Sequence, residues 1–173
     1  MISSSLEKAL NKHLNLELYS AYVYAAMAAY FDSKNLKGFA SWMKIQTSEE
    51  MAHAQKFYAY INDVGGRVVL DAIDKPADEY KSPLAAFKTA LEHERKVTKA
   101  IYKLVDLAQG ESHHATTTFL QWFVTEQVEE EAVADDIVKR LSMVGESPEG
   151  LFLMDRELGA RQSAGTAGSA TAK

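Results

Sequence analysis

The sequence predicts an all-α fold, a bundle of four long helices with one long crossover between the second and third, followed by a short fifth helix. The composition supports this fold, because 47% of the 173 residues are hydrophobic and only 3 are proline. Four long segments also repeat apolar residues at alternating steps of three and four, which places these residues on one face of a helix. Breaks that contain glycine or proline separate these segments.

The composition also limits the function. Cysteine is absent, which excludes disulfides, CxxC redox chemistry and thiolate metal sites. The formal net charge of -5 argues against nucleic acid as a main partner and mildly favours cations. No signal sequence opens the chain, and no apolar run approaches the roughly 20 residues of a membrane span. We therefore expect a soluble, cytoplasmic protein with neither nucleic acid nor membrane as a partner.

The first helix is expected to follow the N-cap serines at residues 3–5 and to end at about residue 31 or 32. Glu17 interrupts its apolar seam near the middle. The helix is apolar on other faces too, through Leu14, Leu18, Tyr22, Ala25, Ala26, Ala29 and Tyr30. A helix that is apolar on more than one face is buried on more than one side, so we expect it to contribute to a subunit interface.

The second helix is expected over residues 36–64, antiparallel to the first, and the glycines at residues 65–66 end it. Its seam contains Glu50 and His53 where apolar residues are expected. A bare carboxylate in a core is costly unless a cation or a hydrogen-bond donor accompanies it. Because Glu-x-x-His places both side chains one turn apart, the pair can bind one metal ion.

Residues 67–82 lack helical periodicity and include Pro76. Unstructured connections of this length are unusual inside a compact domain. However, a helix of about 28 residues is roughly 42 Å long, and an extended segment of about 16 residues can reach about 53 Å. The segment can therefore return along the whole bundle, which makes the third helix parallel to the second.

The third helix is expected from residue 82 to about residue 108, with Pro83 at its first helical position and Glu94 near the middle of its seam. The fourth helix follows a break at residues 109–111. Its seam contains the polar pair Gln127 and Glu130, spaced i, i+3.

A short fifth helix is expected after the Ser-Pro pair at residues 147–148. It is too short to be stable alone and too apolar to lie in water, so it must pack against other elements. Residues 1–161 therefore form one domain. We expect residues 162–173, which are rich in Ser, Ala, Gly and Thr, to be a disordered tail.

The polar residues of the four seams are expected to meet in one layer, because the helices are similar in length: Glu17, Glu50, His53, Glu94, Gln127 and Glu130. Four carboxylates that lie close together cannot all remain ionised without compensation, and two divalent cations would balance them. Oxygen ligands with one nitrogen and open coordination positions suit iron or manganese better than copper or a closed structural zinc site.

From residue 6 to residue 161 the chain resembles the prokaryotic non-haem ferritins of the ferritin-like di-iron carboxylate family. Five motifs carry the resemblance: the Glu-Glu-Met-Ala-His run at 49–53, Glu17, Tyr24 two turns later, Glu94, and Glu-Gln-Val-Glu-Glu at 126–130. Each motif is weak alone, but their order and their places on the seams make the combination specific. The resemblance implies a ferritin-like bundle.

The resemblance also implies roles for the seam residues. Glu17, Glu50 and His53 would hold a first iron, and Glu50 would bridge to a second iron held by Glu94 and Glu130. Gln127 would be a near neighbour that orients ligands or oxygen, with Tyr24 and Trp122 beside the centre.

A third iron position of the family maps onto Glu49, Glu126 and Glu129, with Glu130 adjacent. Residues 126, 129 and 130 share one helix face through their i, i+3, i+4 spacing. The implied function is iron storage in a homo-oligomeric shell of 24 subunits. This shell would oxidise iron(II) with dioxygen or peroxide at the two-metal centre and store iron(III) mineral inside.

Several of these residues have plainer interpretations. A single seam glutamate is more often a paired structural residue, and a lone His53 would more often be a hydrogen-bonded core histidine. Coincidence in all four helices and the spacing of Glu50 and His53 favour the metal site. We expect a structural role for His13, which lies one turn before Glu17.

Aromatic packing alone is an alternative to an electron-supply role for Tyr24 and Trp122, and the glutamates at 129–131 could form only a solvated face. A bacterioferritin-like haem protein with Met51 as axial ligand is the nearest alternative. The fourth helix, however, has Gln127-x-x-Glu130 where a symmetric site needs a second Glu-x-x-His. A DNA-protecting miniferritin or a non-enzymatic structural shell or interaction bundle is a further alternative.

Overall fold

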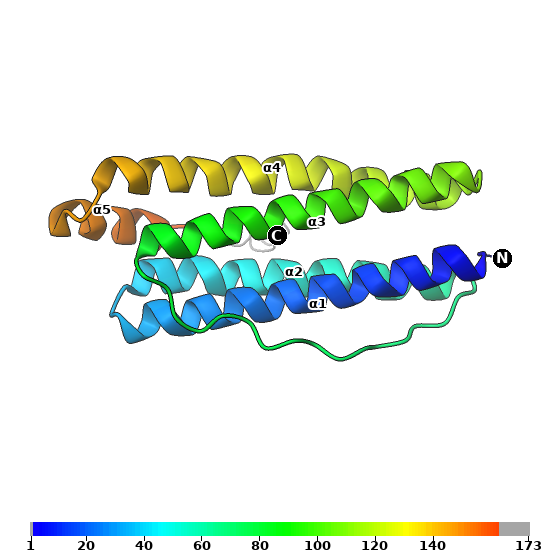
Figure 1. Cartoon of the computed structure of the whole chain (residues 1–173), viewed down its shortest axis with the longest axis horizontal. Coiled ribbons are helices and arrows are strands. Elements are labelled where there is room, and N and C mark those ends of the chain that lie inside the picture. Colours follow the sequence, from blue (N-terminus) through cyan, green and yellow to red (C-terminus); the bar gives the residue numbers. More distant parts are fainter. Residues whose placement is uncertain (1, 163–173) are drawn as a thin grey trace, which may run out of the picture.

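The structure is a computed structural model that describes residues 2–162, and it confirms the predicted fold (Figure 1). The helices are α1 (Ser4–Ser33), α2 (Lys37–Asp63), α3 (Pro83–Gly110), α4 (His114–Val144) and α5 (Pro148–Leu158). No strand occurs in this part of the chain. The tail predicted for residues 162–173 lies outside the described residues, except for residue 162 itself.

Serine side chains begin three of the helices, as their sequence positions predict. The hydroxyls of Ser3, Ser82 and Ser147 each accept a backbone N–H from the first turn of α1, α3 and α5, respectively. Pro83 and Pro148 occupy the first turns of α3 and α5, where no intrahelical N–H bond is required. Local sequence therefore fixes where these helices start.

The crossover at residues 67–82 runs the length of the bundle beside α1 (Figure 1). Asn11 of α1 holds the start of the crossover through two hydrogen bonds, since its Nδ2 donates to the Arg67 carbonyl (2.9 Å) and its Oδ1 accepts from the Val69 N–H (2.7 Å). Further along, Tyr30 donates to the Tyr80 carbonyl. This return path makes α3 parallel to α2, as predicted.

Helix α5 packs on the start of α2. The N-cap residue of α2, Leu36, provides no side-chain cap. Instead, Asp155 of α5 accepts the backbone N–H groups of Gly38 (2.8 Å) and Phe39 (3.0 Å). A Cβ atom at Gly38 would lie 1.6 Å from the Asp155 carbonyl oxygen, so only glycine permits this approach. The contact fixes the position of α5 on the bundle.

Two hydrophobic clusters fill the ends of the bundle. One contains residues such as Phe31, Phe39 and Phe87, and the other contains Leu10 and Phe57 among others. Between them lies a buried polar layer composed of Glu17, Ser20, Gln46, Glu50, His53, His93, Glu94, Thr98, Gln127 and Glu130. The predicted interruptions of the four seams therefore meet at one level.

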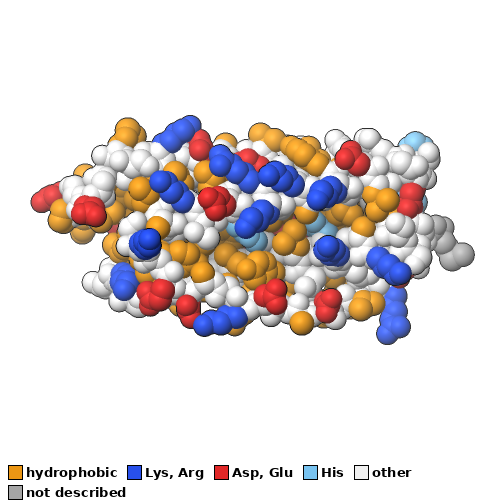
Figure 2. All heavy atoms as spheres, in the orientation of Figure 1, with side chains coloured by type: hydrophobic (Ala, Val, Ile, Leu, Met, Phe, Trp, Pro, Cys, Tyr) orange, Lys and Arg blue, Asp and Glu red, His pale blue; other side chains and the backbone are white. Residues whose placement is uncertain are grey.

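Figure 2 shows basic side chains across the middle of the face that carries α1 and α3. Helix α3 carries the exposed basic residues Lys88, Arg95, Lys96, Lys99 and Lys103. The carboxylates of the polar layer do not contribute to this surface, because they are buried beneath it. Among the described helices, none combines the length and apolarity needed to span a bilayer; the cytoplasmic location stays a prediction.

Candidate metal centre

All four long helices contribute to the polar layer. α1 contributes Glu17, α2 contributes Glu50 and His53, α3 contributes Glu94, and α4 contributes Gln127 and Glu130. Each of these side chains belongs to a residue that is at most 9% exposed. The layer is thus a buried collection of four carboxyl groups, one amide and one imidazole, as the seams predict.

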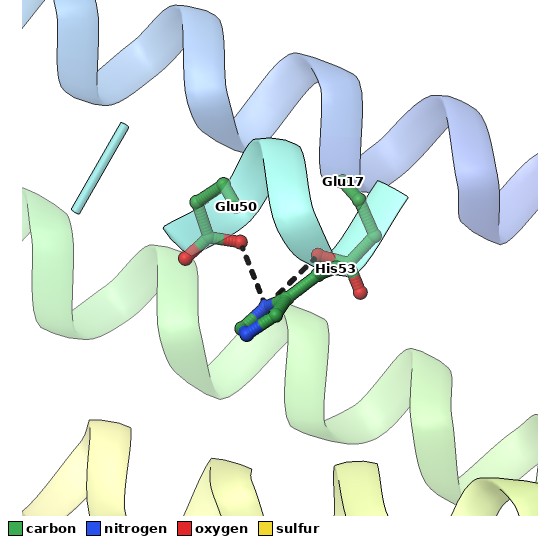
Figure 3. A group of neighbouring side chains, drawn as sticks. All are labelled: Glu17, Glu50 and His53. Carbon is green, nitrogen blue, oxygen red and sulfur yellow. Dashed lines mark ion pairs between the residues drawn. The ribbon is translucent and has the colours of Figure 1, made fainter. Parts of the chain in front are cut away.

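Glu17, Glu50 and His53 form the α1–α2 half of the layer. Figure 3 shows their side chains directed toward one another. His53 Nδ1 lies 3.5 Å from Glu50 Oε2 and 4.0 Å from Glu17 Oε2, and one ligand atom of each residue lies within 4.8 Å of the others. Glu17 Oε2 is buried without a hydrogen-bond partner. An unpartnered buried oxygen that faces an imidazole and a second carboxyl group suits a bound cation.

The other oxygen of Glu17 has a partner. His13 lies one turn earlier on α1, and its Nε2 donates to Glu17 Oε1 at 2.8 Å. The contact orients Glu17 and leaves its second oxygen facing His53, which agrees with the structural role expected for His13.

Glu94 and Glu130 form the α3–α4 half, and neutral side chains provide their hydrogen bonds. Tyr24 donates its hydroxyl to Glu94 Oε1, and Gln127 Nε2 donates to Glu94 Oε2 at 3.2 Å. Gln46 Nε2 donates to Glu130 Oε2 at 2.7 Å. No lysine, arginine or histidine pairs with either carboxyl group within the described residues.

Burial controls the protonation of the layer. Burial, followed by the neighbouring carboxylates, raises the pKa of Glu50 well above its ordinary value. The same causes raise the pKa of Glu130 to about 8, and burial raises that of Glu94 to about 7. Without a cation, these carboxyl groups therefore retain protons near neutral pH.

Glu17 differs from the other three carboxyl groups. Burial alone would raise the pKa of Glu17, but the hydrogen bond and attraction of His13, together with His53, outweigh it and lower that pKa. Burial lowers the pKa of His53, so its imidazole is neutral and has a free lone pair for a metal. The donor set of oxygens and one neutral imidazole fits iron.

A second cluster consists of His53, Glu126 and Glu130. It contains Glu126, one of the three carboxylates assigned to a third iron position, and the adjacent Glu130, but Glu49 and Glu129 lie outside both clusters of the described residues. Glu49 Oε2 instead accepts from Arg161 Nη2 at 2.6 Å, and Glu129 is exposed. The third position therefore stays a prediction.

The two aromatic residues expected beside the centre lie there. Tyr24 is buried and contacts Glu94 through its hydroxyl. Trp122 is 40% exposed, and its ring centroid lies 5.3 Å from that of His53 in an edge contact. Lys56 Nζ also contacts Trp122, at 2.9 Å from its ring centroid. Their packing is therefore established, and an electron-supply role stays a prediction.

Three members of the layer or its surroundings had no role assigned from sequence. Gln46 could have been found, because it lies one turn before Glu50 on the same seam. His93 is buried, with its Nε2 2.8 Å from Ser20 Oγ, but it lies off the seam and no spacing signal marks it. Arg161 follows the last helix, where no periodicity exists.

Comparison with known proteins identifies the family. Residues 7–148 match the family described as "Ferritin-like domain". The chain belongs to the ferritin family. Among its relatives is a bacterial non-heme ferritin of Staphylococcus aureus (strain USA300), 40% identical over 161 residues, which cover 93% of this chain and 97% of the relative. A probable bacterial non-heme ferritin-like protein of Haemophilus influenzae is 40% identical over 92% of this chain and 96% of its own.

Solved structures agree with these sequence relatives. The open pore ferritin from the hyperthermophilic archaeon Archaeoglobus fulgidus has 51% sequence identity and a TM-score of 0.93, and the match covers 94% of this chain and 100% of that one. Iron storage is accordingly the function of this ferritin, and its clusters of carboxyl and histidine side chains are suited to hold iron.

Proposed function

We propose that this ferritin oxidises iron(II) at a two-metal centre within each subunit, with dioxygen or peroxide as the oxidant, and stores the iron(III) mineral in a shell. The observation that carries the proposal is the convergence of carboxyl groups from all four long helices with one imidazole in a single buried layer. Their donor atoms come from one chain, so no partner subunit is needed to complete the centre.

The two halves of the layer provide the proposed ligands. Glu17 and His53 hold the first iron(II), Glu94 and Glu130 hold the second, and Glu50 bridges the two ions. Glu50 suits the bridge because it contacts His53 on one side and shares the Gln46 amide with Glu130 on the other. Two adjacent iron(II) ions can each give one electron to the oxidant, which reduces dioxygen to the level of peroxide.

The protein also supplies protons. Glu94 and Glu130, with pKa values of about 7 and about 8, hold protons before iron binds and release them as ligands. Gln127 donates to Glu94 and keeps this carboxyl group oriented. We assign a third iron position to Glu49, Glu126 and Glu129 with Glu130 adjacent, supported by the cluster that Glu126 and Glu130 form with His53.

Exposed apolar side chains support assembly into a homo-oligomer. Met143, Phe152 and Leu153 are 80%, 67% and 55% exposed, and the last two lie on α5. Large apolar side chains exposed together on a short helix mark a protein interface. We propose that they pack against neighbouring subunits of a shell, with the 24 subunits that the resemblance to the non-haem ferritins implies.

Oxygen uptake on addition of iron(II) tests the proposal. At two iron(II) per subunit, we expect Glu50→Ala and Glu94→Ala to lower the initial rate of oxygen uptake by at least about 100-fold, beyond the range for loss of an outer-shell partner. Glu92→Ala is the matched control, because Glu92 is an exposed carboxylate on α3. If both variants oxidise iron as fast as the parent, the assigned centre is wrong. If the parent itself oxidises iron no faster than buffer alone, the chain is a non-enzymatic shell.

The haem alternative predicts a different protein. Met51, its candidate axial ligand, is 41% exposed on α2, and the relatives described above are named non-heme ferritins. We expect the purified protein to show no Soret band. A Soret band that Met51→Leu removes would establish haem binding instead.

A further inference from the structure

Arg161 follows α5, yet its guanidinium group reaches the edge of the metal layer. Its Nη1 donates to Gln46 Oε1 at 2.9 Å, and its Nη2 donates to Glu49 Oε2 at 2.6 Å. Its Cζ also lies 4.6 Å from the centroid of the Trp42 ring. Two hydrogen bonds and one cation–π contact thus hold a single side chain from outside the four-helix bundle.

The three contacts of Arg161 all come from one face of α2. Trp42, Gln46 and Glu49 are spaced i, i+4, i+7, so they lie above one another on successive turns. A planar guanidinium can stack on the ring and donate to both polar groups at the same time, which an ammonium group cannot do. This face of α2 therefore forms a binding site whose shape and acceptors suit an arginine side chain.

Gln46 connects this place to the metal centre. Its Nε2 donates to Glu50 Oε1 at 3.2 Å and to Glu130 Oε2 at 2.7 Å. A guanidinium group has donors only, so the amide oxygen of Gln46 must face Arg161. The NH₂ group must then face the two carboxyl groups, one from α2 and one from α4.

We propose that Arg161 is a positioning residue of the metal centre, which acts through the Gln46 amide on the orientation of Glu50 and Glu130. The inference rests on the proposed function, because that function makes these two carboxyl groups iron ligands. Without Arg161 the amide is free to rotate. It can then also adopt the flipped orientation, in which its oxygen faces carboxylate oxygens and repels both ligands from the geometry they need.

The backbone around Arg161 is fixed well enough for this role. Asp155 caps the start of α2 through Gly38 and Phe39, and Gly159 lies against Gly38. Gly38 precedes Gln46 by about two turns of the same helix. The helix that carries the amide is therefore also the helix that anchors the segment before Arg161.

Binding of cobalt(II), which reports ligand geometry through its visible spectrum, tests the proposal on the full-length assembled protein. We expect Arg161→Gln to weaken cobalt(II) binding by about tenfold and to change the spectrum, in line with the loss of other outer-shell partners. Arg161→Lys keeps the charge but loses the planar set of guanidinium donors, so its cobalt(II) affinity should lie between those of Arg161→Gln and the parent.

Arg140→Gln is the matched control. Arg140 pairs with Glu157 of α5 through an exposed ion pair, so this variant removes a positive charge beside α5 without a contact to Gln46. We expect its cobalt(II) affinity to stay within about twofold of the parent. Size-exclusion chromatography shows whether each variant assembles.

A double-mutant cycle shows whether Arg161 acts through Gln46. If it does, Arg161→Gln combined with Gln46→Leu should bind cobalt(II) no more weakly than Gln46→Leu alone. Additive losses would overturn the proposal. The proposal would also be overturned if Arg161→Gln kept the cobalt(II) affinity and spectrum of the parent. If Arg161→Gln does not assemble, the same outcome in Arg161→Lys would overturn it. If the parent itself neither binds cobalt(II) nor oxidises iron, the proposed function fails instead.

Discussion

The two halves of the metal layer hold their carboxyl groups in different ways. In the α1–α2 half, imidazoles accompany Glu17: His13 donates to one oxygen, and His53 lies near the other. In the α3–α4 half, a phenol and two amides provide the hydrogen bonds to Glu94 and Glu130. The pKa of Glu17 is lowered, whereas those of Glu94 and Glu130 are raised to about 7 and about 8.

This difference teaches how one buried layer can take up two cations in turn. In the proposed two-metal centre, Glu17, whose pKa is lowered, is ionised before any cation arrives, so the α1–α2 half would attract the first ion. The α3–α4 half retains protons and, under the same proposal, would have to release them before it could coordinate the second ion. Glu50, whose pKa is raised by burial and by carboxylates of both halves, lies between these two behaviours.

The largest expected loss of cobalt(II) affinity comes from a substitution in the α1–α2 half. His53 is the one residue shared by both metal clusters of the described residues. His53→Ala should therefore weaken cobalt(II) binding by about 100-fold, whereas Gln127→Leu in the other half should weaken it by about tenfold, as for an outer-shell partner. Isothermal titration calorimetry measures both affinities. Equal losses would show that the imidazole contributes no more than the amide and that the halves do not differ.

A pH series separates the halves without mutation. Since the pKa values of Glu94 and Glu130 are about 7 and about 8, lowering the pH from 8 to 6 should weaken the second cobalt(II) by about tenfold per pH unit for each proton released. The first cobalt(II) should change less, because the pKa of Glu17 is lowered and, of its carboxyl ligands, only the bridging Glu50 holds a proton. An indicator dye in weak buffer measures the protons released. Equal pH dependence for both ions would contradict the comparison.

Much of this centre is predictable from sequence, and the reason is geometric. Helical periodicity determines which face Glu17, Glu50, Glu94 and Glu130 share with the apolar seam, and similar helix lengths determine the level at which they meet. A long crossover was also predictable, since residues 67–82 are long enough to return along the bundle. These features depend only on local spacing and chain length.

The remaining features depend on contacts between distant segments. Arg161 reaches Gln46 only because Gly38 allows α5 to approach α2 closely, and no periodic pattern encodes that approach. His93 lies off its seam and is buried by the packing of α1 against α3. The opposite pKa shifts of Glu17 and Glu130 likewise arise from burial and partners that only the folded chain brings together.

Substitution of one glutamate in each half should change the stability of the metal-free protein in opposite directions. The folded-state pKa of Glu130 is raised, so its stabilising contribution is full below about pH 4.5 and is lost as the pH rises through about 8. Glu130→Gln should therefore raise the melting temperature at pH 8. The pKa of Glu17 is lowered, so its contribution is present above its ordinary pKa and is lost as the pH falls. Glu17→Gln should lower the melting temperature at pH 8.

Calorimetry of both variants at pH 5 and pH 8 measures these effects. Each pKa unit corresponds to about 1.4 kcal/mol, so shifts of a few degrees are expected at pH 8. The effect of Glu130→Gln should be smaller at pH 5, where the carboxyl group is mostly protonated in the folded chain. Destabilisation by both variants at pH 8 would mean that the α3–α4 half does not retain its protons.

The smallest expected effect comes from the phenol that orients the α3–α4 half. The hydroxyl of Tyr24 donates to Glu94 and lowers the pKa of that carboxyl group against the larger effect of burial. Tyr24→Phe should raise the pKa of Glu94 further and weaken the second cobalt(II) at pH 7 by about threefold, below the usual range for an outer-shell partner because Gln127 still donates to Glu94. Tyr22→Phe is the control, since Tyr22 is exposed on the same helix. If both variants bind the second ion with parental affinity, Tyr24 contributes packing alone. The two amides would then be the neutral donors that distinguish this half.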